Sequence, residues 1–308
     1  GSSKRPGWSS ELVPRLMKIA FLGSPPPAVP ILERIVSDGH VITTVVTPPD
    51  RKRGRGGALM PTAVGDAART RGLPVVHRLA ECDFSSVDVA VVVAYGRLIP
   101  TSYLEQVPML NVHFSLLPRW RGAAPVERAL LAGDEETGVC VMGIEPELDT
   151  GPVYLRSHTS IGHKSSAELL SELAEMGAEA MSEVLSRFTE IAPTPQVGDA
   201  TYADKLVAQD FVIEPHMSAI QAERVIRLGR TRIHVGPLTV KIHRATVREG
   251  GVEAGSVDAS SDIVLGFREG ALALEVVQPD GGRAMSASDW WRGQRFGADV
   301  SWSAATRP

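Results

Sequence analysis

Short apolar runs alternate with amphipathic stretches over the first two thirds of the chain. The apolar runs predict buried strands, and apolar residues recurring every three or four positions predict helices. The predicted strands lie at 18–23, 41–47, 75–77, 87–94, 107–110 and 139–144, and the predicted helices at 29–36, 63–71 and 165–188. This alternation is typical of an α/β fold with a doubly wound, mostly parallel sheet.

The pattern changes after residue 192. Two prolines and a glycine interrupt residues 193–198, which predicts a linker, taken here as 193–210. One helix is predicted at 218–228, and short apolar runs follow at 233–235, 238–243, 263–267 and 271–277. Strands of this length and spacing predict a small β-barrel or sandwich. We therefore expect a first domain at 17–192 and a second domain at 211–308, with Trp290 and Trp291 packed on the barrel.

Composition limits the class of protein. Apolar residues make up 43% of the 308 positions, which is enough for substantial cores. The formal net charge of −4 argues against a generally basic nucleic-acid coat, although local basic patches stay possible. The two cysteines, Cys82 and Cys140, fit neither a metal site nor a disulfide scaffold, so a reducing cytoplasm is expected.

The first sixteen residues carry no apolar segment of the kind found in secretory signals. They begin Gly-Ser-Ser and contain Leu-Val-Pro-Arg at 12–15, which looks like an added leader. We expect residues 1–16 to be disordered or extended and the native fold to begin at Met17. No apolar run in the chain approaches the ~20 residues of a membrane span.

Polar residues with catalytic potential follow the predicted strands. Asn111 and His113 are two positions apart, so in an extended chain they point to the same side. If the run at 139–144 is a neighbouring strand, Asp149 lies near them and completes a set suited to proton transfer and oxyanion binding. Each residue also has a structural explanation, as a strand-end partner, a hydrogen-bonded histidine or a turn-forming aspartate.

A second argument joins these residues into one site. In an open α/β sheet, ligands bind beyond the carboxyl ends of the strands. The Tyr95-Gly96 pair, the Asn111-x-His113 pair and Asp149 all fall at or just after the ends of predicted strands. We therefore expect them to lie around one ligand.

The stretch from Asn111 to Gly151 resembles the 10-formyltetrahydrofolate-dependent formyltransferases. Their signature of Asn-x-His, a Ser-Leu-Leu-Pro-type loop and a later Leu-Asp-x-Gly is matched in order, and Arg-Trp-Arg-Gly-Ala-Ala-Pro at 119–125 is similar to the methionyl-tRNA formyltransferases in particular. The resemblance implies an OB-like barrel after a Rossmann-like domain, 10-formyltetrahydrofolate as co-substrate and no metal. It implies Asn111, His113 and Asp149 as catalytic residues. It also implies folate contacts from Tyr95, Gly96, Ser115, Leu116, Leu117 and Pro118.

Residues 49–61 form a basic, glycine-rich segment without periodicity. It is either a solvated flexible loop or a mobile basic element that binds phosphate by releasing counterions. The resemblance includes a basic insertion of this type, which implies that Arg51, Lys52, Arg53 and Arg55 contact initiator methionyl-tRNA.

The second predicted domain contains a further basic stretch. From Arg224 to Arg248 there is no Asp or Glu, but there are seven Lys or Arg residues. We expect a surface that takes a phosphate backbone. The alternative is a fold that places its acids elsewhere.

The resemblance implies formyl transfer from 10-formyltetrahydrofolate to the α-amino group of methionyl initiator tRNA, for translation initiation. The alternatives are a small-molecule formyltransferase acting on glycinamide ribonucleotide or an amino sugar, a formyltetrahydrofolate hydrolase, and a folate-binding module without turnover. The basic segment and the second domain argue against the small-molecule enzyme. We expect a cytoplasmic protein and a monomer, because no heptad repeat or exposed apolar helix stands out.

Overall fold

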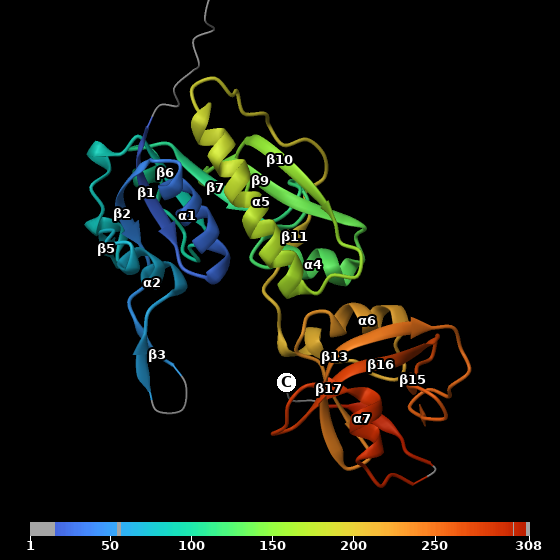
Figure 1. The fold of residues 1–308 in the computed structure, drawn as a ribbon. Coiled ribbons are helices and arrows are strands. Elements are labelled where there is room, and N and C mark those ends of the chain that lie inside the picture. Colours follow the sequence, from blue (N-terminus) through green and yellow to red (C-terminus); the bar gives the residue numbers. More distant parts are fainter. Residues whose placement is uncertain (1–15, 54–56, 298, 306–308) are drawn as a thin grey trace, which may run out of the picture. The chain divides into compact units, whose positions relative to one another are not determined.

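Seven strands form the first sheet in the computed structural model, which describes residues 16–53, 57–297 and 299–305 (Figure 1). The sheet order is β10-β9-β7-β6-β1-β2-β5. Its strands are β1 (Lys18–Gly23), β2 (Val41–Val46), β5 (Val75–Val76), β6 (Val89–Val93), β7 (Met109–His113), β9 (Glu136–Gly143) and β10 (Val153–Ser160). Neighbours from β7 to β5 pair in parallel, whereas β9 runs antiparallel to β7. The prediction of a mostly parallel, doubly wound sheet is confirmed.

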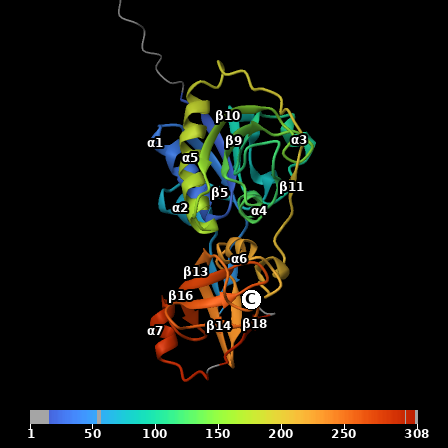
Figure 2. The same ribbon diagram turned by 90° about the vertical axis from the view of Figure 1, so that its right-hand side faces the viewer.

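The longer helices of this part bury one face each. Helix α1 (Val29–Ser37) buries Ile31, Leu32 and Ile35, and α2 (Ala63–Thr70) begins where the Thr62 hydroxyl accepts a hydrogen bond from the Gly65 N–H at 2.9 Å. The long α5 (Ser166–Ser186) buries the apolar stripe that its sequence predicted. Figure 2 shows α1 and α5 on the same face of the sheet. The remaining helices and 3₁₀ turns of this region are η1 (Pro26–Ala28), η2 (Leu79–Glu81), η3 (Phe84–Ser86), α3 (Thr101–Leu104) and α4 (Pro125–Ala132).

The basic segment is more regular than predicted. Strands β3 (Arg51–Arg53) and β4 (Ala58–Met60) pair antiparallel, and we call residues 49–61 the basic hairpin. Arg51 and Lys52 are exposed, while Gly54, Arg55 and Gly56 lie outside the described residues, as does the expected leader up to residue 15. At the base of the hairpin, the Arg69 guanidinium of α2 binds both oxygens of Asp50, at 3.1 and 3.0 Å. This bidentate pair lowers the pKa of Asp50 and fixes where the hairpin begins.

The second sheet is an antiparallel, nearly closed barrel, as predicted. Its order is β14-β15-β16-β13-β12-β18, with β17 beside β16. The strands are β12 (Arg232–Val235), β13 (Leu238–Arg248), β14 (Val257–Asp258), β15 (Ile263–Gly266), β16 (Ala271–Pro279), β17 (Met285–Ser286) and β18 (Trp302–Ala304). The two edges meet where the Val257 N–H donates to Val300 O at 3.2 Å and the Trp302 N–H donates to Gly255 O at 2.8 Å.

Three further elements accompany the barrel: η4 (Ala208–Phe211), α6 (Ala219–Ile226) and α7 (Ala287–Arg292). Trp290 of α7 is 2% exposed and belongs to the barrel core, and the partly buried Trp291 packs against the same core. The expected packing of this tryptophan pair is confirmed.

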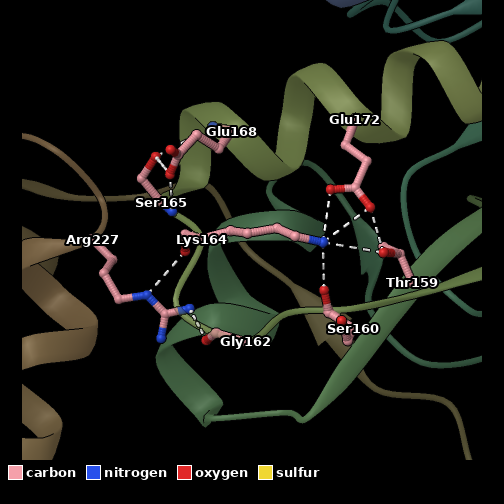
Figure 3. A network of polar contacts seen from close by, with 8 residues as sticks. All are labelled: Thr159, Ser160, Gly162, Lys164, Ser165, Glu168, Glu172 and Arg227. Carbon is pink, nitrogen blue, oxygen red and sulfur yellow. Dashed lines mark hydrogen bonds and ion pairs between the residues drawn. The ribbon is translucent and has the colours of Figure 1, made fainter.

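The described chain divides into two compact units. The first holds the described residues up to His113 together with 140–156 and 174–196, and the second holds 114–139, 157–173 and the described residues from 197 on. Within the second unit, Arg227 of α6 donates to Gly162 O and Lys164 O, both at 2.9 Å (Figure 3). The barrel is thereby tied to the turn that precedes α5. The linear division into 17–192 and 211–308 stays a prediction.

The same turn carries a second set of contacts (Figure 3). The Lys164 ammonium lies 2.7 Å from Glu172 Oε2 and donates to Ser160 O at 2.8 Å. Lys164 and the Thr159 hydroxyl, which also donates to Glu172, hold the pKa of that carboxyl below its usual range. The contacts fix the turn that receives Arg227.

Residues 224–248 contain no Asp or Glu, but several of their arginines contact acidic side chains from other parts of the chain. Arg232 pairs with Asp280, Arg244 with Glu275 at 3.2 Å and Arg248 with Asp262 at 3.5 Å. Arg224 donates to Ala132 O at 3.2 Å. The partners come from other parts of the chain, which supports the alternative that this fold places its acids elsewhere.

The stability of the first sheet should depend on pH through His40. This residue is 8% exposed, and its Nδ1 accepts a hydrogen bond from the Met17 N–H at 3.1 Å. Burial lowers the pKa of His40 below its ordinary value of 6.5, although nearby Asp38 opposes the shift. Below pH 6.5 the unfolded chain then binds more protons than the folded one, so stability is lost as the pH falls from 6.5 towards the folded pKa.

In His40→Asn, the amide oxygen can accept the same hydrogen bond but does not titrate. Between pH 7.5 and pH 5, which lie on either side of about 6.5, we expect the melting temperature of this variant to fall less than that of the wild type. Thermal unfolding of both proteins across this range measures the difference. Parallel curves would show that His40 does not contribute.

Candidate active site

Strand β7 carries Asn111 and His113 on one face of the sheet. Asn111 is paired with Val92 of β6 and with Met142 of β9, and His113, the last residue of β7, is opposite Cys140. Because both residues lie in the same strand two positions apart, their side chains share a face, as predicted. His113 is 5% exposed. Such burial lets a hydrogen bond from the imidazole act in a low dielectric, where it is stronger than in water.

Asp149 lies in the connection from β9 to β10, residues 144–152. Its Oδ2 is 3.7 Å from Nδ1 of His113, and the two side chains are 12% and 6% exposed. This separation is an ion-pair distance rather than a direct hydrogen bond. Catalytic contacts are often long before substrate binds and shorten in the reacting complex. The structure therefore brings together the imidazole and the carboxylate that the sequence predicted to be neighbours.

The reason for this proximity differs from the one predicted. Because β9 is antiparallel to β7, its carboxyl end is paired with the start of β7, with Gly143 opposite Leu110. Tyr95 follows a parallel strand and His113 ends one, so both lie at the carboxyl ends of parallel strands, where ligands are expected. Asp149 does not. Asp149 reaches His113 because the connection turns back along β7.

The backbone of the turn that carries Asp149 restricts which residues fit at positions 149 and 151. Asp149 has φ +53°, a left-handed conformation that Asp and Asn tolerate better than most residues. At Gly151 a Cβ would lie 1.9 Å from Gly143 O, so only glycine fits. The Asp-Thr-Gly sequence thus fits this turn, and the turn-forming explanation of Asp149 is compatible with a catalytic one.

Gln196 contacts the turn that carries Asp149, and the sequence reasoning missed this contact. Its side-chain amide donates to the carbonyl of Asp149 at 2.8 Å and to the carbonyl of Gly151 at 2.9 Å. It lies in the stretch predicted to be a linker, directly after Pro-Thr-Pro. No spacing or motif marks it, because its partners are backbone atoms more than forty positions earlier in the chain.

The Tyr95-Gly96 pair follows β6, next to the point where strand order reverses between β1 and β6. Ala94 and Gly96 have φ of 45° and 75°, and the space around the Gly96 Cα is open. The Ser24 hydroxyl after β1 donates to Ala94 O at 3.4 Å. Tyr95 is 5% exposed, and burial raises the pKa of its hydroxyl, which is therefore protonated at neutral pH. Crevices at such reversal points are where open α/β sheets bind ligands.

The Ser-Leu-Leu-Pro loop turns two of its side chains inward. The fully buried Ser115 hydroxyl donates to Arg119 O at 2.6 Å, and Leu117 is 3% exposed. Ser115 and Leu117 are therefore almost inaccessible as whole residues, and Leu116 and Pro118 are the residues of this loop that keep part of their surface exposed.

The Arg-Trp-Arg-Gly segment that follows is held by side chains of the second unit. Arg119 binds Asp134 through two nitrogens, at 2.8 and 2.6 Å, and stacks over the Trp120 ring at 4.4 Å. The Trp120 indole N–H donates to the same carboxylate at 2.8 Å. A Cβ at Gly122 would lie 2.8 Å from Ala203 O, so the glycine allows β8 (Arg121–Gly122) to pair with β11 (Tyr202–Ala203). This motif has a structural role in the described chain.

Family comparison agrees with both parts of this architecture. A family model described as formyl transferase matches residues 17–185, and one described as formyl transferase, C-terminal domain, matches residues 205–295. The chain belongs to the formyl transferase family.

Curated relatives of this formyltransferase cover nearly its whole length. A methionyl-tRNA formyltransferase of Thermus thermophilus is 41% identical over 295 residues, which is 90% of this chain and 96% of the relative. That of Dechloromonas aromatica is 39% identical over 295 residues, with the same coverage.

Solved structures share the fold of the formyltransferase at lower identity. An N-formyltransferase from Helicobacter canadensis, in complex with folinic acid and dTDP-3-aminofucose, matches with a TM-score of 0.65 at 16% identity, over 84% of this chain and 99% of that one. HypX from Aquifex aeolicus, in complex with tetrahydrofolic acid, matches with a TM-score of 0.62 at 14% identity, over 93% and 51%.

Two other kinds of feature are absent from the described part of the formyltransferase. Across residues 16–53, 57–297 and 299–305, no group of three or more His, Cys, Asp or Glu side chains is arranged to hold a metal ion. Within the same described ranges, no helix combines the length and the apolar character needed to span a membrane.

Proposed function

We propose that this formyltransferase transfers the formyl group of 10-formyltetrahydrofolate to the α-amino group of methionyl initiator tRNA, for translation initiation. The observation that carries the proposal is its identity of about 40% to methionyl-tRNA formyltransferases over 90% of the chain. The structures of amino-sugar enzymes support the fold alone, because their sequence identity is low. We further propose that the protein acts as a monomer in the cytoplasm, and sedimentation of the purified protein tests its oligomeric state.

Asn111 and His113 stabilise the charge that develops on the formyl oxygen. The folate supplies an activated formyl group, and the neutral amine of methionine forms the new C–N bond as the bond to the folate nitrogen breaks. Hydrogen bonds from the Asn111 amide and the His113 imidazole stabilise that charge. A donor of this kind stabilises the transition state by about 3 kcal/mol.

Asp149 takes the proton that the attacking amine loses, directly or through water. The departing folate nitrogen gains a proton, so the overall reaction is balanced. The Asp149 carboxylate lies 3.7 Å from Nδ1 of His113, so it favours the tautomer with a proton on that nitrogen and orients the ring. The effect on His113 requires the short separation of the two side chains.

We assign the folate contacts to two loops. The Tyr95-Gly96 loop offers the open space beside Gly96. The second loop is Ser115, Leu116, Leu117 and Pro118, of which Leu116 and Pro118 keep part of their surface exposed. Because Ser115 and Leu117 are buried, their conservative replacement should alter stability more than the affinity for folate.

The basic hairpin is proposed to bind tRNA through Arg51, Lys52, Arg53 and Arg55. Replacing all four with glutamine should raise the KM for tRNA by about ten-fold or more. It should also reduce the slope of log affinity against log salt by about 0.7–0.9 for each phosphate that is no longer neutralised. Steady-state assays at several salt concentrations measure both quantities.

A matched control removes the same charge elsewhere. Arg34, Arg71, Arg78 and Arg187 are exposed residues of the first unit outside the hairpin. Their replacement with glutamine should leave the KM within about two-fold and the salt slope nearly unchanged, as expected for charges that contact no phosphate. Equal effects of the two sets would mean that only net charge matters, and an unchanged KM in the hairpin variant would remove the proposed tRNA contact.

The acceptor assay tests the function itself. Purified protein is given 10-formyltetrahydrofolate with methionine charged on initiator tRNA, and in parallel with glycinamide ribonucleotide or a nucleotide-linked amino sugar. Formylmethionyl-tRNA should be the main product. Preferential formylation of a small amine would favour a small-molecule transferase, and formate release without any acceptor would favour a hydrolase.

A further inference from the structure

Gln196 holds the turn that carries Asp149. Residues 145–148 of this turn are exposed, so little packing fixes its outer side. Within the turn, the Thr150 hydroxyl donates to Glu147 O at 3.1 Å. From outside it, the Gln196 amide reaches the carbonyls on both sides of Thr150, at 2.8 and 2.9 Å. One amide group thus fixes the backbone of Asp149 and Gly151 together.

The segment that presents Gln196 is itself anchored. The Val153 N–H donates to Thr194 O at 2.8 Å, and the Thr194 N–H donates to Val153 O at 2.9 Å. Val153 is the first residue of β10 and 2% exposed, so it gives Thr194 a rigid partner. Gln196 therefore extends from a fixed backbone onto the adjacent turn.

The chemistry of the amide fits this task. Its NH₂ group has two donor hydrogens, and each is directed to one carbonyl oxygen. Glutamate at this position would place a second oxygen against those carbonyls, and asparagine would be too short by one methylene to reach both from the same backbone. Methionine has a similar length without the donors.

We propose that Gln196 is a positioning residue that keeps the Asp149 carboxylate beside His113 during formyl transfer. The inference rests on the proposed role of Asp149. Asp149 is in a left-handed conformation, 3.7 Å from the imidazole, so a small relaxation of its backbone would separate the two groups. A misplacement of about 1 Å in a catalytic group can lower a rate by about a hundred-fold.

The test compares Gln196→Met and Gln196→Glu with the wild type. Both variants should lower kcat by about 10–100-fold, as expected for a displaced catalytic group. The KM for tRNA should stay within about two-fold, because binding away from the reacting atoms is untouched. Circular dichroism and thermal unfolding identify any variant that fails to fold.

Thr194→Val is the matched control. It removes the Thr194 hydroxyl, which donates to Val153 O at 3.3 Å, from the same segment without touching the Asp149 turn. We expect kcat within about two-fold of the wild type, as usual for a single substitution away from the reacting groups. A loss of kcat equal to that in Gln196→Met would show that the segment matters only as a structural support, which would overturn the proposal.

A double substitution separates positioning from general stability. If Gln196 acts through Asp149, adding Gln196→Met to Asp149→Asn should lower kcat no further. If the two substitutions lowered kcat independently, so that their fold-losses multiplied in the double variant, the inference would be overturned. Near-normal kcat in Gln196→Met beside an inactive Asp149→Asn would overturn the positioning role alone, whereas full activity in Asp149→Asn would overturn the proposed chemistry and the positioning role with it.

Discussion

Asp149→Asn is expected to lower the rate of formyl transfer by about 10²–10⁴-fold, the usual contribution of a general base. Asparagine has nearly the same shape and tolerates the left-handed conformation of residue 149, so the turn and its hydrogen bonds to Gln196 should survive. The variant lacks the negative charge beside His113 and the ability to accept the amine proton. Single-turnover transfer to methionyl initiator tRNA, with enzyme in excess, measures this step.

Glu147→Gln is the control for Asp149→Asn. Glu147 is an exposed carboxylate of the same turn, two positions earlier, and the hydrogen bond that it accepts from Thr150 uses its backbone carbonyl. The control should transfer the formyl group at close to the normal rate. If Asp149→Asn did the same, Asp149 could not be the base.

His113→Ala is expected to have the second-largest effect, a loss of about 10²–10³-fold in kcat, as for removal of an oxyanion donor. The imidazole is one of two proposed donors to the formyl oxygen, and it is buried where water does not easily replace a missing hydrogen bond. The KM for tRNA should change little. Steady-state kinetics, together with thermal unfolding to account for the cavity, measure the effect.

His77→Ala provides the comparison for His113→Ala. The His77 ring is hydrogen-bonded to Thr47 O at 3.0 Å, away from the proposed chemistry, so its loss should alter stability but not kcat. In addition, His113→Ala combined with Asp149→Asn should cost less than the product of the two single effects, because residues that act as a unit are not additive. Fully multiplicative losses would indicate two independent roles.

The sequence predicted the elements that bury a continuous apolar run or one apolar face. Strand β6 is apolar throughout and α5 has apolar residues at helical spacing, so a pattern alone identifies them. Strand β10 was missed because it is an edge strand whose exposed positions include Arg156 and His158, and such a strand lacks a continuous apolar run. The basic hairpin was missed for a related reason, since the described side chains of its two strands, at 51–52 and 58–60, are all exposed and create no buried pattern.

The site was predictable only in part. Asn111 and His113 share a face because strands have a period of two, which is a local property of the chain. The proximity of Asp149 depends on a neighbouring antiparallel strand, and the contact of Gln196 depends on backbone carbonyls far away in sequence. Likewise, the sequence did not identify the acidic partners of three arginines between 224 and 248. These partners, Asp280, Glu275 and Asp262, lie outside that stretch. Contacts of this kind become visible only when the fold is known.

A crystal structure with a bound formyl-carrying folate tests whether the three proposed catalytic side chains surround the formyl group. The measurement is the position of the formyl group relative to Asn111, His113 and Asp149. We expect the formyl oxygen to lie about 2.7–3.1 Å from the Asn111 amide nitrogen and from an imidazole nitrogen of His113, with the Asp149 carboxylate facing the formyl carbon. A formyl group bound away from these three side chains would contradict this expectation.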